Sequence, residues 1–427
     1  MRISLALIMT CILWVISTSQ AAAQARGRTD RIDRVDRIID RAAARDRQID
    51  RLREQEDIRD DSALRDRERR LGQPSRRHNL DEDTQYNQMI TLDDRNFPIR
   101  RDQVLALGLS SQARQLARAQ GFSILRERVV MNGQVLSVLQ GDGFLSSLEM
   151  IDLLRNIDPI GIYTPNHVYA PVGQITDNQV TSNVEPANNY QKSQYRVGII
   201  DGALQIDHAK LQGKLGARRS FAERPHQGTE HATAVALQLA RYVPSDTALY
   251  AAAVLSGETV QWADAAAIVE ALAWLSDETV KTVNISLAGP PNDIVALTVE
   301  QYQNNQGIII AAVGNEGPLS RSIYPAAYEG VIGVTAVDED NNIFPYATRG
   351  DHVDVAALGV DVVIDGKSYT GTSFAAPYVT ALALKMNTDI QTRIESSTDL
   401  GQAGRDPIFG WGRIDTNAPN TVAASLK

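Results

Sequence analysis

The feature that most constrains the fold is a series of near-continuous apolar segments that alternate with helical patterns after residue 195. Runs of this kind indicate strands buried on both faces, because a strand with one solvated face alternates apolar and polar residues. The expected strands are 196–200, 246–254, 282–287, 307–313 and 331–337, and the expected helices are 262–275 and 294–304. This order predicts an α/β domain with a mostly parallel sheet and helices on both faces.

Three polar residues lie at the carboxyl ends of these strands. Asp201 follows the first strand, Ser286 lies at the end of the third, and Asn315 follows the fourth. The carboxyl ends of parallel strands meet at one edge of the sheet, where ligands bind. The sequence therefore predicts a functional site at this edge.

A second folded unit is expected at residues 97–171. Strand and helix patterns follow one another in the order β-α-β-β-α-β, with Asn132-Gly133 as a hairpin turn. Ser110-Ser111 and Ser147 are placed to cap the two helices. This order is typical of a small α+β, ferredoxin-like domain. The unit contains no nucleophile–base pair, and His167 is interpreted as a packing or surface residue.

The first 24 residues have the pattern of a signal peptide: Arg2, an apolar run over residues 3–16, and then Ala21-Ala22-Ala23. The alternative is an uncleaved membrane anchor. The only cysteine, Cys11, lies inside this segment, so we expect no disulfide in the mature protein. The pattern predicts a secreted or periplasmic protein with no membrane association after signal cleavage.

Residues 25–96 are rich in Arg and Asp, with a thin apolar stripe at helical spacing. A charged, partly helical or disordered segment is the preferred interpretation, and a docking helix is the alternative. Basic and acidic residues nearly balance here, and the whole chain carries a net charge of −9. Nucleic acid is therefore not expected as a partner.

Four motifs resemble those of the subtilisin-like serine peptidases, the subtilases. They are Val-Gly-Ile-Ile-Asp201-Gly, His231-Ala-Thr-Ala-Val-Ala, Ala-Val-Gly-Asn315-Glu-Gly and Gly-Thr-Ser373-Phe-Ala-Ala-Pro. The serine motif is the most specific, and the order Asp, His, Ser strengthens the resemblance. The resemblance implies a peptidase domain at 195–427, an inhibitory prodomain at 97–171 and a linker at 172–194.

The resemblance also implies roles for individual residues. Ser373 would be the nucleophile, His231 the general base, Asp201 the residue that orients the imidazole, and Asn315 an oxyanion donor. The substrate-binding residues implied are Ser286, Leu287, Ala288 and Gly314. The implied function is a secreted serine endopeptidase that forms an acyl-enzyme. Its partners would be polypeptide substrates and its own prodomain, acting in cis as an inhibitor.

Several residues depart from the family pattern, including Ala232, Ala234, Ala288 and Tyr378. None of these departures removes a proton-transfer group or an oxyanion donor. The alternative function is an exported binding or scaffold protein built on an inactive subtilisin-like fold.

The sequence also gives expectations for cofactors and for specificity. No HExxH motif or Cys/His cluster is present, so no cofactor is expected to be required. The acidic loop 338–341 could bind structural calcium, but a solvated turn is the preferred interpretation. Ala288 and Ile323 predict a shallow apolar pocket that favours Ala, Val or Leu before the cut. Alternatively, Arg321 could turn inward and select an acidic residue.

Overall fold

The computed structural model describes residues 88–172, 193–223, 228–257, 261–321, 323–386 and 389–414, all within one compact unit. The expected signal peptide, residues 25–87 of the charged segment and residues 173–192 of the linker lie outside the described residues. Within the described part, no helix is long and apolar enough to cross a membrane.

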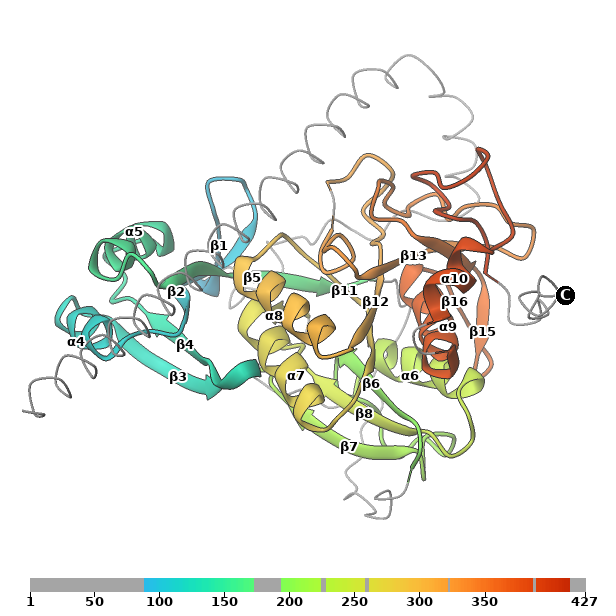
Figure 1. Ribbon diagram of the computed structural model, residues 1–427, viewed down its shortest axis with the longest axis horizontal. Coiled ribbons are helices and arrows are strands. Elements are labelled where there is room, and N and C mark those ends of the chain that lie inside the picture. Colours follow the sequence, from blue (N-terminus) through green and yellow to red (C-terminus); the bar gives the residue numbers. More distant parts are fainter. Residues whose placement is uncertain are drawn as a thin grey trace, which may run out of the picture. The chain divides into compact units, whose positions relative to one another are not determined.

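A seven-stranded sheet organises the second half of the chain (Figure 1). Its strand order is β14-β13-β12-β10-β6-β8-β7, and each neighbouring pair is parallel. The strands are β6 (Arg196–Asp201), β7 (Leu215–Ser220), β8 (Ala248–Ala253), β10 (Thr282–Ile285), β12 (Ile308–Ala312), β13 (Ile332–Val337) and β14 (Val355–Leu358). A hairpin of β15 (Val362–Ile364) and β16 (Lys367–Tyr369) follows. The predicted parallel α/β sheet is confirmed.

Helices cover both faces of this sheet. They are α6 (Glu230–Tyr242), α7 (Ala265–Asp277), α8 (Asp293–Asn304), α9 (Thr372–Met386) and the short α10 (Ile390–Glu395). Val197 and Ile199 of β6 pack in one apolar cluster with residues of α6 and α9. Gly198 faces the other way, because a Cβ there would lie 2.9 Å from Leu275 of α7. Strand residues therefore alternate between two apolar layers, as the unbroken apolar runs predicted.

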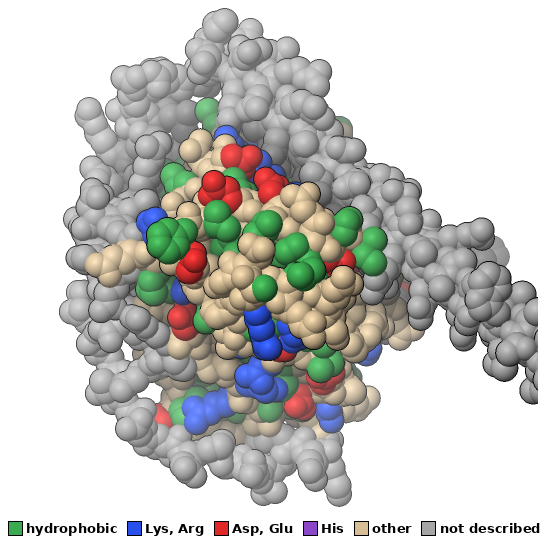
Figure 2. All heavy atoms as spheres, turned by 90° about the vertical axis from the view of Figure 1, so that its left-hand side faces the viewer, with side chains coloured by type: hydrophobic (Ala, Val, Ile, Leu, Met, Phe, Trp, Pro, Cys, Tyr) green, Lys and Arg blue, Asp and Glu red, His purple; other side chains and the backbone are tan. Residues whose placement is uncertain are grey.

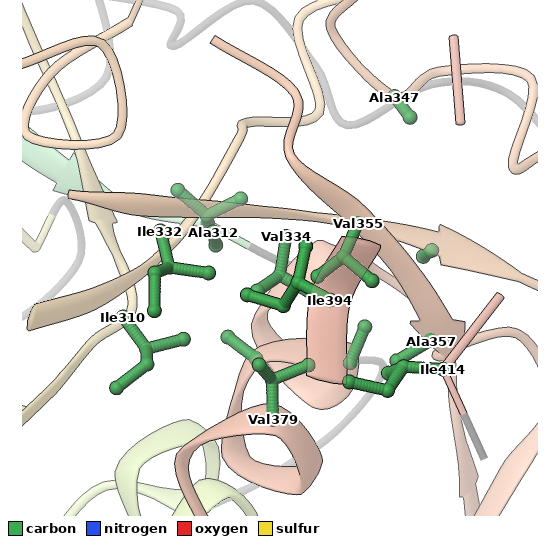
Figure 3. Close-up of a cluster of buried hydrophobic side chains, with 14 of the residues drawn as sticks. Ile310, Ala312, Ile332, Val334, Ala347, Val355, Ala357, Val379, Ile394 and Ile414 are labelled. Atoms are coloured by element: carbon green, nitrogen blue, oxygen red, sulfur yellow. The ribbon is translucent and has the colours of Figure 1, made fainter. Parts of the chain in front are cut away.

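The largest apolar layer joins α9 to strands β12, β13 and β14. Val379 of α9 points toward Ile310, Val334 and Val355 of the sheet, and all four are completely buried (Figure 3). Apolar burial on this scale is the main favourable contribution to folding. It also holds α9, the helix that carries Ser373, against the sheet.

The N-terminal domain is an antiparallel sheet with two helices. Its elements are β2 (Pro98–Leu107), α4 (Ser111–Ala119), β3 (Ser123–Val129), β4 (Val135–Gln140), α5 (Ser147–Ile157) and β5 (Ile162–Pro171). The strands lie in the order β5-β2-β4-β3, and β1 (Ile90–Leu92) pairs with β2. The expected β-α-β-β-α-β order is confirmed, and the sheet begins before residue 97.

Capping explains where the helices of this domain begin. Ser110 accepts a hydrogen bond from the Ala113 amide, as expected. The cap of α5 is Ser146 rather than Ser147, because the Ser146 and Glu149 side chains form a reciprocal capping box. Figure 2 views this side of the molecule, where hydrophobic, basic and acidic side chains are interspersed among the described residues.

Candidate active site

Asp201 and His231 form a buried ion pair at the carboxyl edge of the parallel sheet. Asp201 is the last residue of β6, and His231 is the second residue of α6, whose N-cap is Thr229. The Asp201 Oδ1 atom lies 3.1 Å from His231 Nδ1 and also accepts a 2.7 Å hydrogen bond from the Gly202 amide. These contacts fix the imidazole ring relative to the end of the strand.

The His231 ring has acceptors at both nitrogens. Its Nδ1 faces Asp201, and its Nε2 lies 3.0 Å from the backbone oxygen of Val172. Burial of the ring opposes its charged form, but the charge and hydrogen bond of Asp201, together with the Val172 carbonyl, raise the pKa of His231 above its ordinary value. The arrangement therefore favours an imidazolium, the form that a general base takes after receiving a proton.

Ser373 is the second residue of α9. The following residue, Phe374, packs edge-to-face on the His231 ring with the ring centroids 5.6 Å apart. This contact packs the start of α9 against the imidazole. Ser373 is completely buried, and its Oγ has no hydrogen-bond partner among the described residues.

Asn315 follows β12 and is oriented by Thr372. The Asn315 Oδ1 atom accepts hydrogen bonds from the Thr372 amide, at 3.1 Å, and from its hydroxyl, at 2.9 Å. Because Oδ1 has both of these donors, the side-chain NH₂ group is the part of Asn315 available to a further acceptor. Thr372 is the residue before Ser373, so these hydrogen bonds link Asn315 to the start of α9.

The end of β5 lies between two short strands from the second half of the chain. It pairs antiparallel with β9 (Ala263–Asp264) on one side and with β11 (Leu287–Ala288) on the other. Pro171 is opposite Leu287, and Ala170 is opposite Ala288. The tail of the N-terminal domain is thus an inserted strand, which is the arrangement of a peptide bound by strand addition.

Val172 continues this strand to the Asp201–His231 pair. Its amide donates to the Ser286 carbonyl at 3.1 Å, and its own carbonyl is the group that contacts His231 Nε2. The Val172 side chain is buried in a cluster that includes Ala288 and Ile323. The structure therefore gathers Asp201, His231 and Val172 at one point of the inserted strand.

Three of the four residues expected to bind substrate contact the inserted strand, and the fourth, Gly314, contacts Ile323 of the cluster that contains Val172. Ser286, Leu287 and Ala288 contact the inserted strand through the pairs described above. Gly314 has φ +100°, and a Cβ there would lie 2.7 Å from Ile323 Cδ1, so its missing side chain leaves room for Ile323. Arg321 does not turn inward: its Nη1 donates to the Arg95 carbonyl, and its guanidinium lies 5.3 Å from the Phe97 ring centroid.

The sequence did not identify the residues that join the two domains behind the cleft. Asn292 caps α8 with its oxygen, while its Nδ2 donates to the Pro165 carbonyl at 3.0 Å and to His167 Nδ1 at 2.9 Å. The other ring nitrogen of His167 lies 3.3 Å from Asp93. Asn292 followed by Asp293 is a pattern that predicts a helix cap at the start of α8. No local pattern predicts that Asn292 Nδ2 bonds to Pro165 and His167.

Polar groups of the acidic loop at 338–341 form hydrogen bonds with other residues of the chain. Both Asp338 carboxylate oxygens accept from Asn342, and Arg413 donates to the Glu339 carbonyl and to the Asn341 side chain. In the part of the chain that the structure describes, no group of three or more His, Cys, Asp or Glu side chains is placed to hold a metal ion.

Comparison with known proteins identifies the family. The subtilase family model matches residues 192–412. Subtilisin amylosacchariticus from Bacillus subtilis subsp. amylosacchariticus is 29% identical over 283 residues, which cover 59% of this chain and 72% of that protein. Subtilisin DY from Bacillus licheniformis is 30% identical over 261 residues, covering 54% and 93%. The minor extracellular protease Epr from Bacillus subtilis (strain 168) is 26% identical over 309 residues, covering 62% and 48%. Because the family model spans more than half of its residues, this chain belongs to the subtilase family.

Proposed function

We propose that this chain is a secreted serine endopeptidase that hydrolyses peptide bonds through an acyl-enzyme. The observation that carries the proposal is the position of the Val172 carbonyl, 3.0 Å from His231 Nε2, at the end of an inserted strand. The bond to be cut must lie beside the imidazole, because His231 has to carry a proton from the Ser373 hydroxyl to the leaving amine of that bond. Membership of the subtilase family supports the same chemistry.

In the proposed mechanism, the Ser373 hydroxyl attacks the carbonyl carbon while His231 Nε2 takes its proton. His231 then gives this proton to the leaving amine, and water, activated by the same nitrogen, releases the acid product. Asp201 holds Nδ1 and stabilises the imidazolium. The Asn315 amide and the Ser373 backbone N–H, at the start of α9, donate to the oxyanion. Every proton transfer uses a side chain already described.

We further propose that the N-terminal domain is an inhibitory prodomain. Its strand β5 lies in the cleft between β9 and β11, where a substrate would have to bind. Contacts away from the cleft support the docking: Arg126 binds Glu270, and Gln301 binds Gln134, each at 2.8 Å. Occupation of the cleft by the chain's own strand supports inhibition in cis.

Export is the remaining part of the proposal. It is supported by the signal-peptide pattern of residues 1–24 and by the extracellular relative Epr. Mass spectrometry of protein recovered from the culture medium would show which N-terminus is present. Recovery of the chain only from the cytoplasm would contradict export.

A phosphonate probe that labels activated serines tests the catalytic proposal. We expect the protein purified after expression of the full chain to gain one adduct on Ser373, seen by intact mass and peptide mapping. The Ser373→Ala and His231→Ala variants are expected to remain unlabelled. A folded wild-type protein that neither reacts with the probe nor cleaves casein would support the alternative, a binding or scaffold protein.

A further inference from the structure

Tyr369 connects the helix that carries His231 with the helix that carries Ser373. It is the last residue of β16, it is buried, and its hydroxyl donates a 2.8 Å hydrogen bond to Oε1 of Glu230. Glu230 is the residue directly before His231 on α6. The Tyr369 ring also lies 5.1 Å, between centroids, from the ring of Phe374, which contacts the His231 ring. Side chains thus form a continuous path from the start of α6 to the start of α9.

The hairpin that carries Tyr369 is attached to α6 at two places. Tyr369 pairs with Val362 across the β15–β16 hairpin, and both residues are buried in one apolar cluster with residues of α6. Nearer the other end of α6, Arg241 donates to the Val363 carbonyl at 2.8 Å. The Tyr369 ring extends this attachment to α9, because it also contacts Phe374.

The hydrogen bond between Tyr369 and Glu230 has a fixed direction. Burial raises the pKa of Tyr369, and the hydrogen bond to Glu230 and its charge raise the pKa further, so the hydroxyl is a donor at physiological pH. Lys367, on the same strand, donates to the same Glu230 oxygen at 2.8 Å, but its side chain is 61% exposed. An exposed ion pair contributes little, so the buried tyrosine is the stronger attachment.

We infer that Tyr369 is a positioning residue for the proposed reaction. It acts through Glu230 on the α6 side and through Phe374 on the α9 side, so that the imidazole and the serine hydroxyl keep their relative positions. This inference rests on the proposed endopeptidase function. A general base has to lie within hydrogen-bond reach of the proton that it takes, and a displacement of about 1 Å can slow a reaction about 100-fold.

The expected size of the effect follows from the hydrogen bond that Tyr369→Phe removes. Loss of a hydrogen bond to a charged acceptor shifts an equilibrium by about 10- to 150-fold. The Glu230 side chain is 17% exposed, so water can replace part of the lost bond. We therefore expect an effect near the lower limit, about 10-fold.

Steady-state kinetics of the enzyme produced from the full chain test this role. The substrate is the p-nitroanilide of Tyr-Ala-Pro-Val, the sequence of residues 169–172. In Tyr369→Phe, kcat should fall by about 10-fold. KM should change little, because β9, β11 and Ser286 hold the inserted strand. Lys367→Ala is the matched control, since it removes the other contact to the same oxygen, and it should lower kcat at most about 2-fold.

A double-mutant cycle separates positioning from a general loss of packing. If Tyr369 acts through Glu230, the variant with both Tyr369→Phe and Glu230→Ala should lose no more activity than the more damaging single change. Glu230→Gln keeps an acceptor for the hydroxyl and should lose less activity than Glu230→Ala. Multiplicative losses in the double variant, a kcat for Tyr369→Phe equal to that of Lys367→Ala, or a loss carried by KM would overturn the inference.

A second test needs no catalysis and uses the full chain carrying Ser373→Ala. Proton NMR of the histidine rings, with the His231 signals assigned by comparison with His231→Ala, reports the position of this ring relative to Phe374. We expect the His231 signals to shift in Tyr369→Phe and to stay in place in Lys367→Ala. Unchanged His231 signals in Tyr369→Phe would overturn the inference. If the wild-type protein cleaved no peptide, the proposed function would fail, while this measurement would still decide whether Tyr369 positions His231.

Discussion

Replacement of Arg126 by alanine is expected to loosen the N-terminal domain from the domain that contains the parallel sheet. Arg126, on β3, donates from Nε to Glu270 of α7 at 2.8 Å, and its Nη2 lies 3.6 Å from Asp264. The Arg126 side chain is 27% exposed, whereas those of Glu270 and Asp264 are only 5% and 4% exposed. Burial opposes the charge of Arg126, but the two carboxylates outweigh it and raise the Arg126 pKa.

The expected loss of interface stability in Arg126→Ala follows from the two buried carboxylates that remain, Glu270 and Asp264. Removal of one member of a fully buried ion pair costs about 3–5 kcal/mol, because the other charge stays buried without a partner. An exposed pair contributes at most about 1 kcal/mol. Arg126 is partly exposed, so we expect a loss between these limits, about 2–3 kcal/mol. This corresponds to an opening of the domain interface that is about 30- to 150-fold more frequent.

Limited proteolysis of the full chain carrying Ser373→Ala measures this opening. When opening and closing are fast, the rate at which an added protease cuts the N-terminal domain follows the population of the open form. Arg128→Ala is the matched control: Arg128 lies on the same strand, 3.6 Å from the other Glu270 oxygen, but is 57% exposed. We expect less than about a 5-fold effect there. Equal effects of the two variants would refute the argument from burial.

Three further predictions concern the cleft itself. Ser373→Ala should abolish self-cleavage with little change in thermal stability, so that intact-mass analysis finds a full-length precursor; normal trimming of this variant would assign the cut to another protease. Self-cleavage needs neutral His231, whose pKa is raised above its ordinary value because the lowering effect of burial is outweighed by Asp201 and the Val172 carbonyl. The rate should therefore rise as pH increases through that pKa, and a rate that is flat between pH 5 and 9 would contradict this role. Val172→Phe should slow self-cleavage at least 10-fold in a pulse-chase assay, because Val172 is already buried in the cluster with Ala288 and a larger side chain would overpack it; an unchanged rate would show that the cluster accommodates a benzyl group.

The sequence predicted those parts of the site that depend on local pattern. Asp201 ends an apolar strand, so the pattern of neighbouring residues located it, whereas His231 was located by its resemblance to a family motif. Parallel packing of β6, β10 and β12 then brought the strand ends to one edge, as expected. Asp201, Ser286 and Asn315 could therefore be placed at this edge without any long-range contact, while His231 and Ser373 could not.

The inserted strand was not predictable in the same way. The sequence pattern places the last strand of the N-terminal domain at 160–163, but β5 continues through Pro165 to Pro171, although a proline normally argues against the interior of a strand. Its outer half is held by β9 and β11, about 90–120 residues later in the chain. These pairings also explain why the expected helix at 262–275 begins only at Ala265, and why the expected strand 282–287 is divided at Ser286. Such differences arise from partners that lie far away in the sequence.

The double role of β5 explains why inhibition could persist after a cut. Its first half pairs with β2 in the N-terminal sheet, and its second half fills the cleft between β9 and β11. Cleavage after Val172 would leave both sets of strand pairs intact, because every β5 residue in these pairs precedes the cut. The cleaved strand could then leave only together with its domain, or after that domain unfolds. Release of activity in the proposed enzyme therefore depends on the stability of the N-terminal domain and on contacts such as Arg126–Glu270, rather than on cleavage alone.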